Sequence, residues 1–491
     1  MPEPTVYELS SPGRIGFRFP ELDVPEAELP EGLVRKDLPL PELSEPDVVR
    51  HFTHLSVLNY SVDGGLYPLG SCTMKYNPKI NEEMARLEGF SLVHPLQPDD
   101  TIQGSLALMY DLQQALKRIT GFDAFSLQPA AGAHGELTGV LIMRAYHKSR
   151  GDTKRKRIII PDSAHGTNPA SSAMSGLEIV NVPTDKRGNT DLEALRALCD
   201  DTVVGIMLTN PNTLGLFDEN LVEVIRTVHA AGGLVYGDGA NMNALLGIVK
   251  PADLGFDVMH FNLHKTFSTP HGGGGPGSGP VGVRASLAEF LPGPVVDIVE
   301  EGDETTPAIY GFRTPEKSIG RMKSFYGHFG IMVRAFTYIV MNGAEGLRRV
   351  SEMAVLNANY LLARVKGTYT LPYDRLCMHE FVVEGMWDVA PGVHALDVAK
   401  RIIDYRFHPP TNYFPLIVRE ALMIEPTETE TKQTLDAFAD ALIKIAEEAH
   451  TQPELLHDAP HDAPVGRLDE VKAARDLVLC CWPVYSDEPD S

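Results

Sequence analysis

From about residue 104, short β-rich runs alternate with helix-length periodic stretches, and this alternation constrains the fold more than any other feature of the chain. Such alternation is typical of βα units around a mostly parallel sheet whose faces are covered by helices. The sequence therefore predicts an α/β core. Its expected strands are Arg157–Ile160, Glu178–Val182, Val203–Leu208, Leu234–Tyr236 and Val258–Asn262. Its clearest helical patterns are Thr190–Cys199 and Leu221–Ala231, the second closed by Gly232 and Gly233.

The length of 491 residues exceeds the size of a single growing core, so we expect one large and one smaller domain. Nine prolines within the first 50 residues disfavour long helices and sheet ladders there, and residues 1–60 are expected to form an extended arm. The large α/β domain is expected over 61–335. A linking helix within 318–363, a small α+β domain and a tail should complete the chain over 336–491. Three elements are expected there, a strand at Met378–Val383 and helices at His394–Tyr405 and Thr429–Ala449.

Charge and cysteine usage narrow the class of protein. A formal net charge of −23 argues against a nucleic-acid or anionic-membrane partner, because both require a positive surface. Five cysteines without a CxxC pair suit a reducing compartment and indicate no zinc site. The N-terminus lacks the pattern of a signal peptide, and the apolar runs are too short to span a bilayer. We therefore expect a cytoplasmic protein without a metal.

Polar residues follow the expected strands at the positions where open α/β sheets bind ligands. The first such segment is the turn 131–136, and the second contains His165. Asn210 and Asp238 follow the next two strands, and the pair His264–Lys265 follows the last one. Because the carboxyl ends of parallel strands lie at one edge of a sheet, these residues are the candidates for a common site.

Lys265 and Asp238 together match the needs of one cofactor. Pyridoxal phosphate requires a lysine amine that forms a Schiff base with its aldehyde, and a carboxylate that keeps its pyridine nitrogen protonated. Asp238 lies one expected strand upstream of Lys265, and His264 directly precedes the lysine. An aspartate and a lysine at this spacing are also common as a structural ion pair, so the pair alone does not decide.

The turn before the helix that starts near His134 is a candidate for the phosphate group. Gly132 and Ala133 are small, and a free helix N-terminus offers N–H groups and a positive dipole end to a phosphate monoester. An ordinary tight strand-to-helix turn needs small residues as well. The Gly-rich run 271–279 lacks the order of a nucleotide-binding phosphate loop and is interpreted as a loop beside the lysine.

Two further residues fit the same cofactor. His165 could stack its imidazole on one face of a pyridine ring while Ala240 packs against the other face. Asn210 could donate a hydrogen bond to the 3′ oxygen of the cofactor. Each has a plain structural alternative, because a loop histidine commonly makes local hydrogen bonds and Asn-Pro commonly starts a turn.

Nearly the whole chain resembles subunit 2 of the two-chain form of glycine dehydrogenase (decarboxylating), the P-protein family of the glycine cleavage system. The resemblance rests on long motifs in order along the chain. They are LPLPELSEPDVVRHFTHLS (38–56), NYSVDGGLYPLGSCTMKYNPKINE (59–82), LQPAAGAHGELTG (127–139), PDSAHGTNPASS (161–172), LTNPNTLGLF (208–217), YGDGANMNA (236–244) and HFNLHKTFSTPHGGGGPGSGP (260–280). One small departure is His328, where the family is expected to have asparagine.

The resemblance implies the fold-type I architecture of pyridoxal-phosphate enzymes, with Lys265 as the lysine that carries the cofactor. It implies decarboxylation of glycine and transfer of the aminomethyl group to the lipoyl arm of the H-protein. It also implies a partner, subunit 1, in a dimer of heterodimers. The nearest alternatives are a free-standing pyridoxal-phosphate decarboxylase or aminotransferase, and a non-catalytic scaffold, which the presence of Lys265 disfavours.

Three other features stay open at this stage. Cys72 lies in a motif and could line the site, but a structural role is preferred because attack on a disulfide needs no protein thiol. Cys480 and Cys481 lie near an acidic tail and are expected to have no catalytic role. An arginine is the expected partner of the glycine carboxylate, although neither Arg313 nor another arginine can be selected from the sequence.

Overall fold

The computed structural model describes residues 3–34, 38, 40–271 and 277–477, which divide into two units. One unit spans Val62–His457 and contains every sheet. The other combines the N-terminal segment up to Ser61 with the C-terminal segment from Asp458. The run Gly272–Gly275 and the pair Cys480 and Cys481 lie outside the described residues.

In the unit that contains the N-terminal segment, most of the described residues are outside helices and strands. Its helical elements are η1 (Glu31–Leu33), α1 (Glu45–Leu58) and α14 (Glu470–Arg475). The 14-residue helix α1 was not expected within a proline-rich arm. It forms because Ser44 caps it, accepting a hydrogen bond from Asp47 N, and because Pro46 lies in its first turn, where a missing N–H is harmless.

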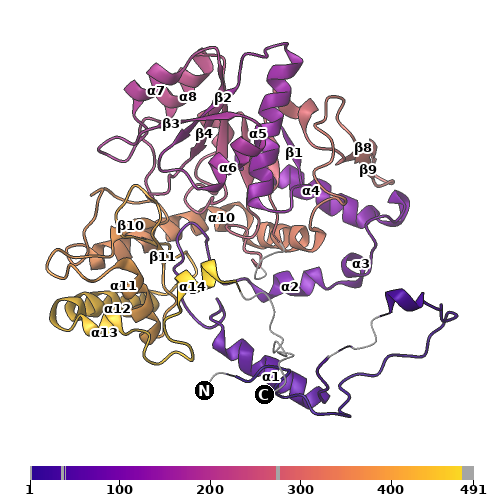
Figure 1. The fold of residues 1–491 in the computed structure, drawn as a ribbon. Helices are drawn as coiled ribbons and strands as arrows, with labels where there is room; N and C mark the ends of the chain where they lie inside the picture. Colours follow the sequence, from indigo (N-terminus) through magenta and orange to yellow (C-terminus); the bar gives the residue numbers. More distant parts are fainter. Residues whose placement is uncertain (1–2, 35–37, 39, 272–276, 478–491) are drawn as a thin grey trace. The chain divides into compact units, whose positions relative to one another are not determined.

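A seven-stranded sheet forms the centre of the larger unit (Figure 1). The strand order is β1-β7-β6-β5-β4-β2-β3. The pairs β3/β2, β2/β4, β4/β5 and β5/β6 are parallel, and β7 runs antiparallel between β6 and β1. The strands are β1 (Ala124–Ser126), β2 (Arg157–Pro161), β3 (Glu178–Val182), β4 (Val203–Thr209), β5 (Leu234–Gly239), β6 (Val258–Phe261) and β7 (Val281–Val283). The mostly parallel α/β sheet expected from the sequence is confirmed.

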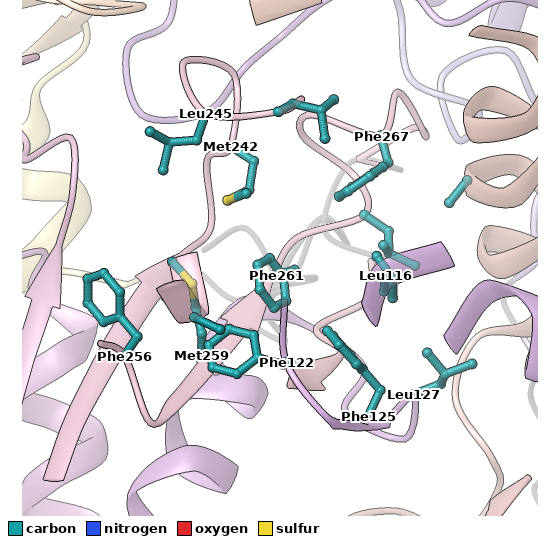
Figure 2. Packing of buried hydrophobic residues seen from close by; sticks show 14 of the residues in the cluster. Leu116, Phe122, Phe125, Leu127, Met242, Leu245, Phe256, Met259, Phe261 and Phe267 are labelled. Atoms are coloured by element: carbon teal, nitrogen blue, oxygen red, sulfur yellow. The ribbon is translucent and has the colours of Figure 1, made fainter. Parts of the chain in front are cut away.

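Alternate residues of the central strands enter two different cores, one on each face of the sheet. On β4, Ile206 belongs to the larger core and Met207 to the smaller one, as the two-residue period of a strand requires. The smaller core packs the strands against α5, and the larger core packs them against α4, α8 and part of α10. Figure 2 shows part of the larger core, where the Phe125 and Phe261 rings lie 5.7 Å apart. Both faces of the sheet are therefore covered by packed helices. This packing holds the strands in place, and with them the strand ends that carry the site.

The helices of this unit flank and connect the sheets. They are α2 (Lys79–Ala85), α3 (Glu88–Ser91), α4 (Gln103–Thr120), α5 (Gly132–Ser149), α6 (Thr167–Met174), α7 (Leu192–Leu198), α8 (Leu221–Ala230), α9 (Pro251–Leu254), α10 (Phe329–Val365), α11 (Ala395–Asp404), α12 (Lys432–Thr451) and α13 (Glu454–His457), with short 3-10 turns η2 (Asp99–Thr101) and η3 (Ala285–Phe290). The long helix α10 starts at Phe329, eleven residues later than the helix-forming composition from Ser318 suggested, and Gly343 interrupts it with φ 59. No helix within the described ranges is long and apolar enough to cross a membrane.

Two small sheets complete the larger unit. The first has the order β10-β12-β11, with β10 (Phe381–Glu384), β11 (Thr411–Asn412) and β12 (Ala421–Ile424) all antiparallel to their neighbours. The second pairs β8 (Val295–Glu300) with β9 (Ile309–Arg313). Helices α11 and α12 and part of α10 share a core with β10 and β12. An α+β region therefore follows the α/β core, as expected.

Candidate active site

A cavity of about 250 Å³ lies at the carboxyl ends of the parallel strands. Its wall brings together seven of the nine residues predicted from the sequence. They are Gly132, Ala133, His165, Asp238, Ala240, His264 and Lys265. The residues come from the ends of four different strands, β1, β2, β5 and β6, so the sheet rather than the local sequence brings them together.

Lys265 lies in the turn that follows β6, and its side chain reaches across the cavity wall. Its Nζ donates a hydrogen bond to Ser71 O at 2.5 Å. Lys265 is the only lysine or arginine in the described wall. A single amine that is exposed to a cavity and held by one backbone carbonyl is suited to covalent attachment of an aldehyde cofactor.

Asp238 lies within β5 rather than after it, because β5 extends to Gly239. Its side chain is 5% exposed, and Oδ1 accepts a hydrogen bond from Ala240 N at 3.0 Å. His260 Nε2 lies 3.6 Å from the same oxygen, and the His260 ring is hydrogen-bonded to Tyr236 on its other side. Burial lowers the pKa of His260 to about 4, so the imidazole beside Asp238 is neutral. The Asp238 carboxylate is therefore held by a backbone N–H group, lies beside a neutral imidazole and forms part of the cavity wall.

The start of α5 faces the cavity without a side-chain cap. Its N-cap residue is Ala131, so the first N–H groups of this 18-residue helix have no side-chain acceptor. A Cβ at Gly132 would lie 2.6 Å from Asn262 Oδ1, so only glycine leaves this space open. The backbone donors and the space that glycine leaves fit a phosphate group.

Several residues of the wall also have buried polar atoms without a hydrogen-bond partner. Thr209 Oγ1, Glu136 Oε2, Asn262 Oδ1 and both ring nitrogens of His379 have no hydrogen-bond partner among the described residues, and all four residues line the wall. Because buried polar atoms are almost always paired, such a group indicates a polar ligand. The cavity therefore fits a cofactor with a phosphate, a ring nitrogen and an aldehyde.

His165 and Ala240, predicted to contact the two faces of a ring, both line the cavity. His165 is exposed, its Nδ1 lies 2.9 Å from Thr167 Oγ1, and its ring contacts Phe414 edge to face. His264 accepts a hydrogen bond from Ser278 N at 3.2 Å, and burial lowers its pKa to about 3.

Two predicted residues lie beside the cavity and not in its wall. Asn210 Oδ1 accepts a hydrogen bond from Asp218 N at 3.0 Å, and its neighbours Thr209 and Pro211 form the wall. His134 Nδ1 accepts one from Ala130 N at 3.2 Å. Their contact with a cofactor remains a prediction.

The structure also shows the surroundings of three other residues discussed above. They are Cys72, Arg313 and His328. Burial raises the pKa of the Cys72 thiol, and the residue is absent from the described wall, although Ser71 is part of it. Arg313 is exposed and pairs with Asp297 at 2.8 Å between β9 and β8. His328 precedes α10 and contacts Gly277 O at 2.7 Å.

Sequence reasoning missed several residues of the wall. Thr209 and Asn262 end or follow strands, and the rule that located Asp238 could have found them. Glu136 is the last residue of the candidate segment 131–136, but the sequence analysis gave it no role. Ser71 and Glu380 come from distant segments and carry no local signal, because only the fold places them beside Lys265.

Comparison with known proteins gives a consistent result. A sequence profile described as "Glycine dehydrogenase, C-terminal domain" matches residues 350–461, and one described as "Aminotransferase class-V" matches 138–277. The chain is 61% identical over 479 residues to the "Probable glycine dehydrogenase (decarboxylating) subunit 2" of Caldanaerobacter subterraneus subsp. tengcongensis, covering 96% of this chain and 98% of that protein. The protein of the same name from Thermotoga petrophila is 57% identical, covering 97% and 99%.

Solved structures share the fold. A glycine decarboxylase (P-protein) of the glycine cleavage system in inhibitor-bound form superposes with a TM-score of 0.72 at 19% identity, covering 85% of this chain and 93% of that one. A NifS-like protein superposes with a TM-score of 0.59 at 16% identity, covering 78% and 99%. The fold is that of the fold-type I family of pyridoxal-phosphate enzymes.

Proposed function

The chain belongs to the family of glycine dehydrogenase (decarboxylating) subunit 2, and from that membership we propose that it removes carbon dioxide from glycine with pyridoxal phosphate held at Lys265. The remaining aminomethyl group would pass to the lipoyl group of an H-protein. The observation that carries the proposal is the meeting of Lys265 and Asp238 in one cavity with the free N-terminus of α5.

Each part of the cofactor has a candidate partner in the wall. Lys265 would bond its aldehyde carbon, and Asp238 would hold a proton on its ring nitrogen. The N-terminus of α5 at Gly132 and Ala133 would bind the phosphate, and His165 would contact the ring. Bound pyridoxal phosphate supplies an electron sink for the electron pair of the broken carbon–carbon bond.

The side chains have separate tasks in the reaction. The Asp238 carboxylate maintains the positive charge that makes the sink effective, and its fixed hydrogen bond from Ala240 N preserves that position. Lys265 would hold the cofactor, and its amine would stay beside the reacting carbon of glycine. The wall offers the glycine carboxylate no arginine within the described residues, so neutral donors or a partner chain would bind it.

We also propose the partners and the compartment. The family name includes "subunit 2", which supports a partner subunit 1, and we propose a heterodimer that pairs into a dimer of heterodimers. A lipoylated H-protein would be the second partner. The acidic charge of −23 supports a role without nucleic acid or membrane surface, and the cysteine pattern supports the cytoplasm.

Isotope exchange between the glycine carboxyl group and bicarbonate tests the function. The purified chain with pyridoxal phosphate is assayed with and without subunit 1 and lipoylated H-protein. Exchange that requires both partners supports the proposal. Release of carbon dioxide without the carrier would contradict it and indicate a free-standing decarboxylase. Lys265→Ala should abolish the exchange, whereas Lys317→Ala, at an exposed lysine paired with Glu289, should retain it.

A further inference from the structure

Two buried glutamates lie side by side at the edge of the cavity. Glu380 immediately precedes β10 and Glu425 immediately follows β12, and the register Phe381↔Ile424 makes them neighbours across the two strands. Glu380 is 3% exposed and Glu425 is fully buried. One ligand atom from each glutamate and one from His379 lie within 4.8 Å of one another. Two carboxylates this close in a buried site disfavour a double negative charge.

The hydrogen bonds of the two glutamates are unequal. Glu425 accepts bonds from Thr73 N at 3.1 Å, Thr73 Oγ1 at 2.7 Å, Asn241 Nδ2 at 2.9 Å and Asn243 Nδ2 at 3.3 Å. Within the described chain, Glu380 accepts one, from Ser71 N at 2.6 Å. Donors stabilise the ionised form, so the negative charge belongs on Glu425 and the proton on Glu380.

The surrounding charges agree with this assignment. Burial raises the pKa of both glutamates, and that of Glu380 lies well above its usual range because the neighbouring charge of Glu425 raises it further. Lys265 is the positive group that acts on both glutamates, while His379 is neutral because burial lowers its pKa to about 3. The Cys72 thiol nearby is also neutral. Glu380 is therefore a carboxylic acid in the wall of the cavity, next to Lys265 and Ser71.

We propose that Glu380 is the acid that protonates the sulfur leaving from a disulfide opened in this cavity, with Glu425 as the charged partner that keeps the proton on it. This inference rests on the proposed function, which makes a disulfide the acceptor of the aminomethyl group.

The step balances without a further reagent. The carbon that has lost carbon dioxide forms a bond to one sulfur, and the sulfur–sulfur bond breaks. The electron pair of that bond goes to the second sulfur, which takes the proton from Glu380. The disulfide is reduced and the carbon is oxidised, and Glu380 regains its proton from water.

The need for an acid follows from the chemistry of the leaving group. An alkyl thiol has a pKa near 8.5, so its thiolate is a poor leaving group at neutral pH inside a cavity. A positioned acid accelerates such a step by about 10²–10⁴-fold. Glu380 lines the described cavity, whereas Glu425 does not, so Glu380 is the glutamate that can reach a disulfide bound there.

The infrared spectrum of the cofactor-free protein at pH 7 gives the first test. A protonated carboxylic acid has a carbonyl band that a carboxylate lacks, and Glu380→Gln should remove one such band. Glu430→Gln is the comparison variant, because burial raises the pKa of Glu430 to about 7 and the residue does not line the described cavity, so at pH 7 it should remove only about half as much of such a band. A spectrum unchanged by Glu380→Gln would overturn the assignment of the proton. Binding of a divalent cation that displaces this proton would overturn it too.

The second test varies the leaving thiol. The chain, loaded with cofactor and combined with subunit 1, is given glycine and one of two acceptors. The first is lipoamide, which is an alkyl disulfide. The second is an aryl disulfide, whose thiol leaves without a proton. Glu380→Gln should slow the opening of lipoamide by about 10²–10⁴-fold and leave the aryl disulfide close to the wild-type rate. Equal losses with both acceptors would overturn the role of Glu380. A wild-type protein that opens neither would instead overturn the proposed function.

Glu425→Gln provides a variant that retains the acid. Without the neighbouring negative charge, the pKa of Glu380 should fall, and the upper pH limit of lipoamide opening should shift to lower pH. If the pH profile of lipoamide opening did not shift in Glu425→Gln, the coupling of the two glutamates would be contradicted. This test does not require Glu380→Gln to fold.

Discussion

At the scale of single residues, the candidate site was predictable where a residue follows a strand. Lys265, Asp238 and Gly132 were located by the rule that ligands bind at the carboxyl ends of parallel strands, and the structure brings all three to one cavity. Glu380 and Ser71 could not be located in this way, because they reach the cavity from segments 309 residues apart that only tertiary contact joins.

Asp238→Asn tests the proposed charge on the ring nitrogen. Asparagine preserves the size of the side chain and an oxygen that can accept from Ala240 N, so cofactor binding should persist. The exchange rate should fall by about 10²–10³-fold, because a fixed charge aimed at the reaction is removed. Isotope exchange at saturating cofactor measures the effect.

The control for this substitution is Asp257→Asn. Asp257 is also largely buried, but its carboxylate contacts His229 and Val235 N away from the described cavity wall. It should affect stability and leave the exchange rate of the folded protein unchanged. A full rate in Asp238→Asn would contradict the role given to that carboxylate.

Gly132→Ala tests the phosphate site. The added Cβ would lie 2.6 Å from the Asn262 amide, so either the start of α5 or the Asn262 side chain must shift. We expect the affinity for pyridoxal phosphate to fall by roughly 10-fold, which corresponds to about 1.4 kcal/mol. Titration of the cofactor-free protein, followed by the absorbance of the bound cofactor, gives this value. Gly104→Ala on α4 is the control, since nothing lies within 4 Å of its Cβ.

At the scale of elements, the strands that the sequence analysis named lie within a few residues of observed strands, and so do most of the helices that it named. The helix α8 ends at Ala230 before Gly232, which has φ 76, as the glycine pair indicated. The start of α10 was predicted too early, because residues 318–328 contain Gly320 and Gly327, both with positive φ, and make tertiary contacts such as Met322 N to Gln128 Oε1. The proline-rich arm likewise contained a helix, because Pro46 occupies a permitted position.

One buried ion pair anchors the segment before α2. Lys75 is almost completely buried and contacts Glu428 Oε1 at 2.6 Å and Thr266 O at 2.7 Å. Lys75→Ala should destabilise the fold by roughly 3–5 kcal/mol, because Glu428 is left as an unpaired buried charge. Chemical denaturation measures the loss.

The matched control is Lys79→Ala, which removes an exposed pair with Asp63 at 2.7 Å. Its effect should stay below about 1 kcal/mol, since solvent screens exposed pairs. Similar losses in the two variants would show that burial does not decide the strength of the Lys75 pair.

At the scale of the whole molecule, the fold class followed from the alternation of strands and helices, whereas the division of the chain did not. The segment from Asp458 groups with the N-terminal segment and not with the preceding α+β region. The sequence offered no signal for this grouping, because the contacts that define it join the two ends of the chain.

The pH dependence of stability should reflect Glu136. Burial and the neighbouring Asp238 charge raise its pKa to about 8, so the cofactor-free folded protein keeps a proton that the unfolded chain releases above about 4.5. Stability is therefore lost as pH rises between these values, at up to about 1.4 kcal/mol per pH unit. Glu136→Gln removes this contribution.

The difference in melting temperature between Glu136→Gln and the wild type should grow in favour of the variant from pH 6 to pH 8. Calorimetry of the cofactor-free proteins in parallel cancels the contributions of all other groups. A difference that is constant over this range would mean that Glu136 is ionised in the folded protein.

The account depends above all on Lys265 as the residue that holds the cofactor. Borohydride reduction of the loaded protein fixes the cofactor to its lysine, and mass spectrometry of the peptides then identifies that residue. We predict that the added mass is found on the peptide that contains Lys265 and that it disappears in Lys265→Ala. Modification of another lysine, such as Lys75, with Lys265 left unmodified, would contradict the assignment of the site.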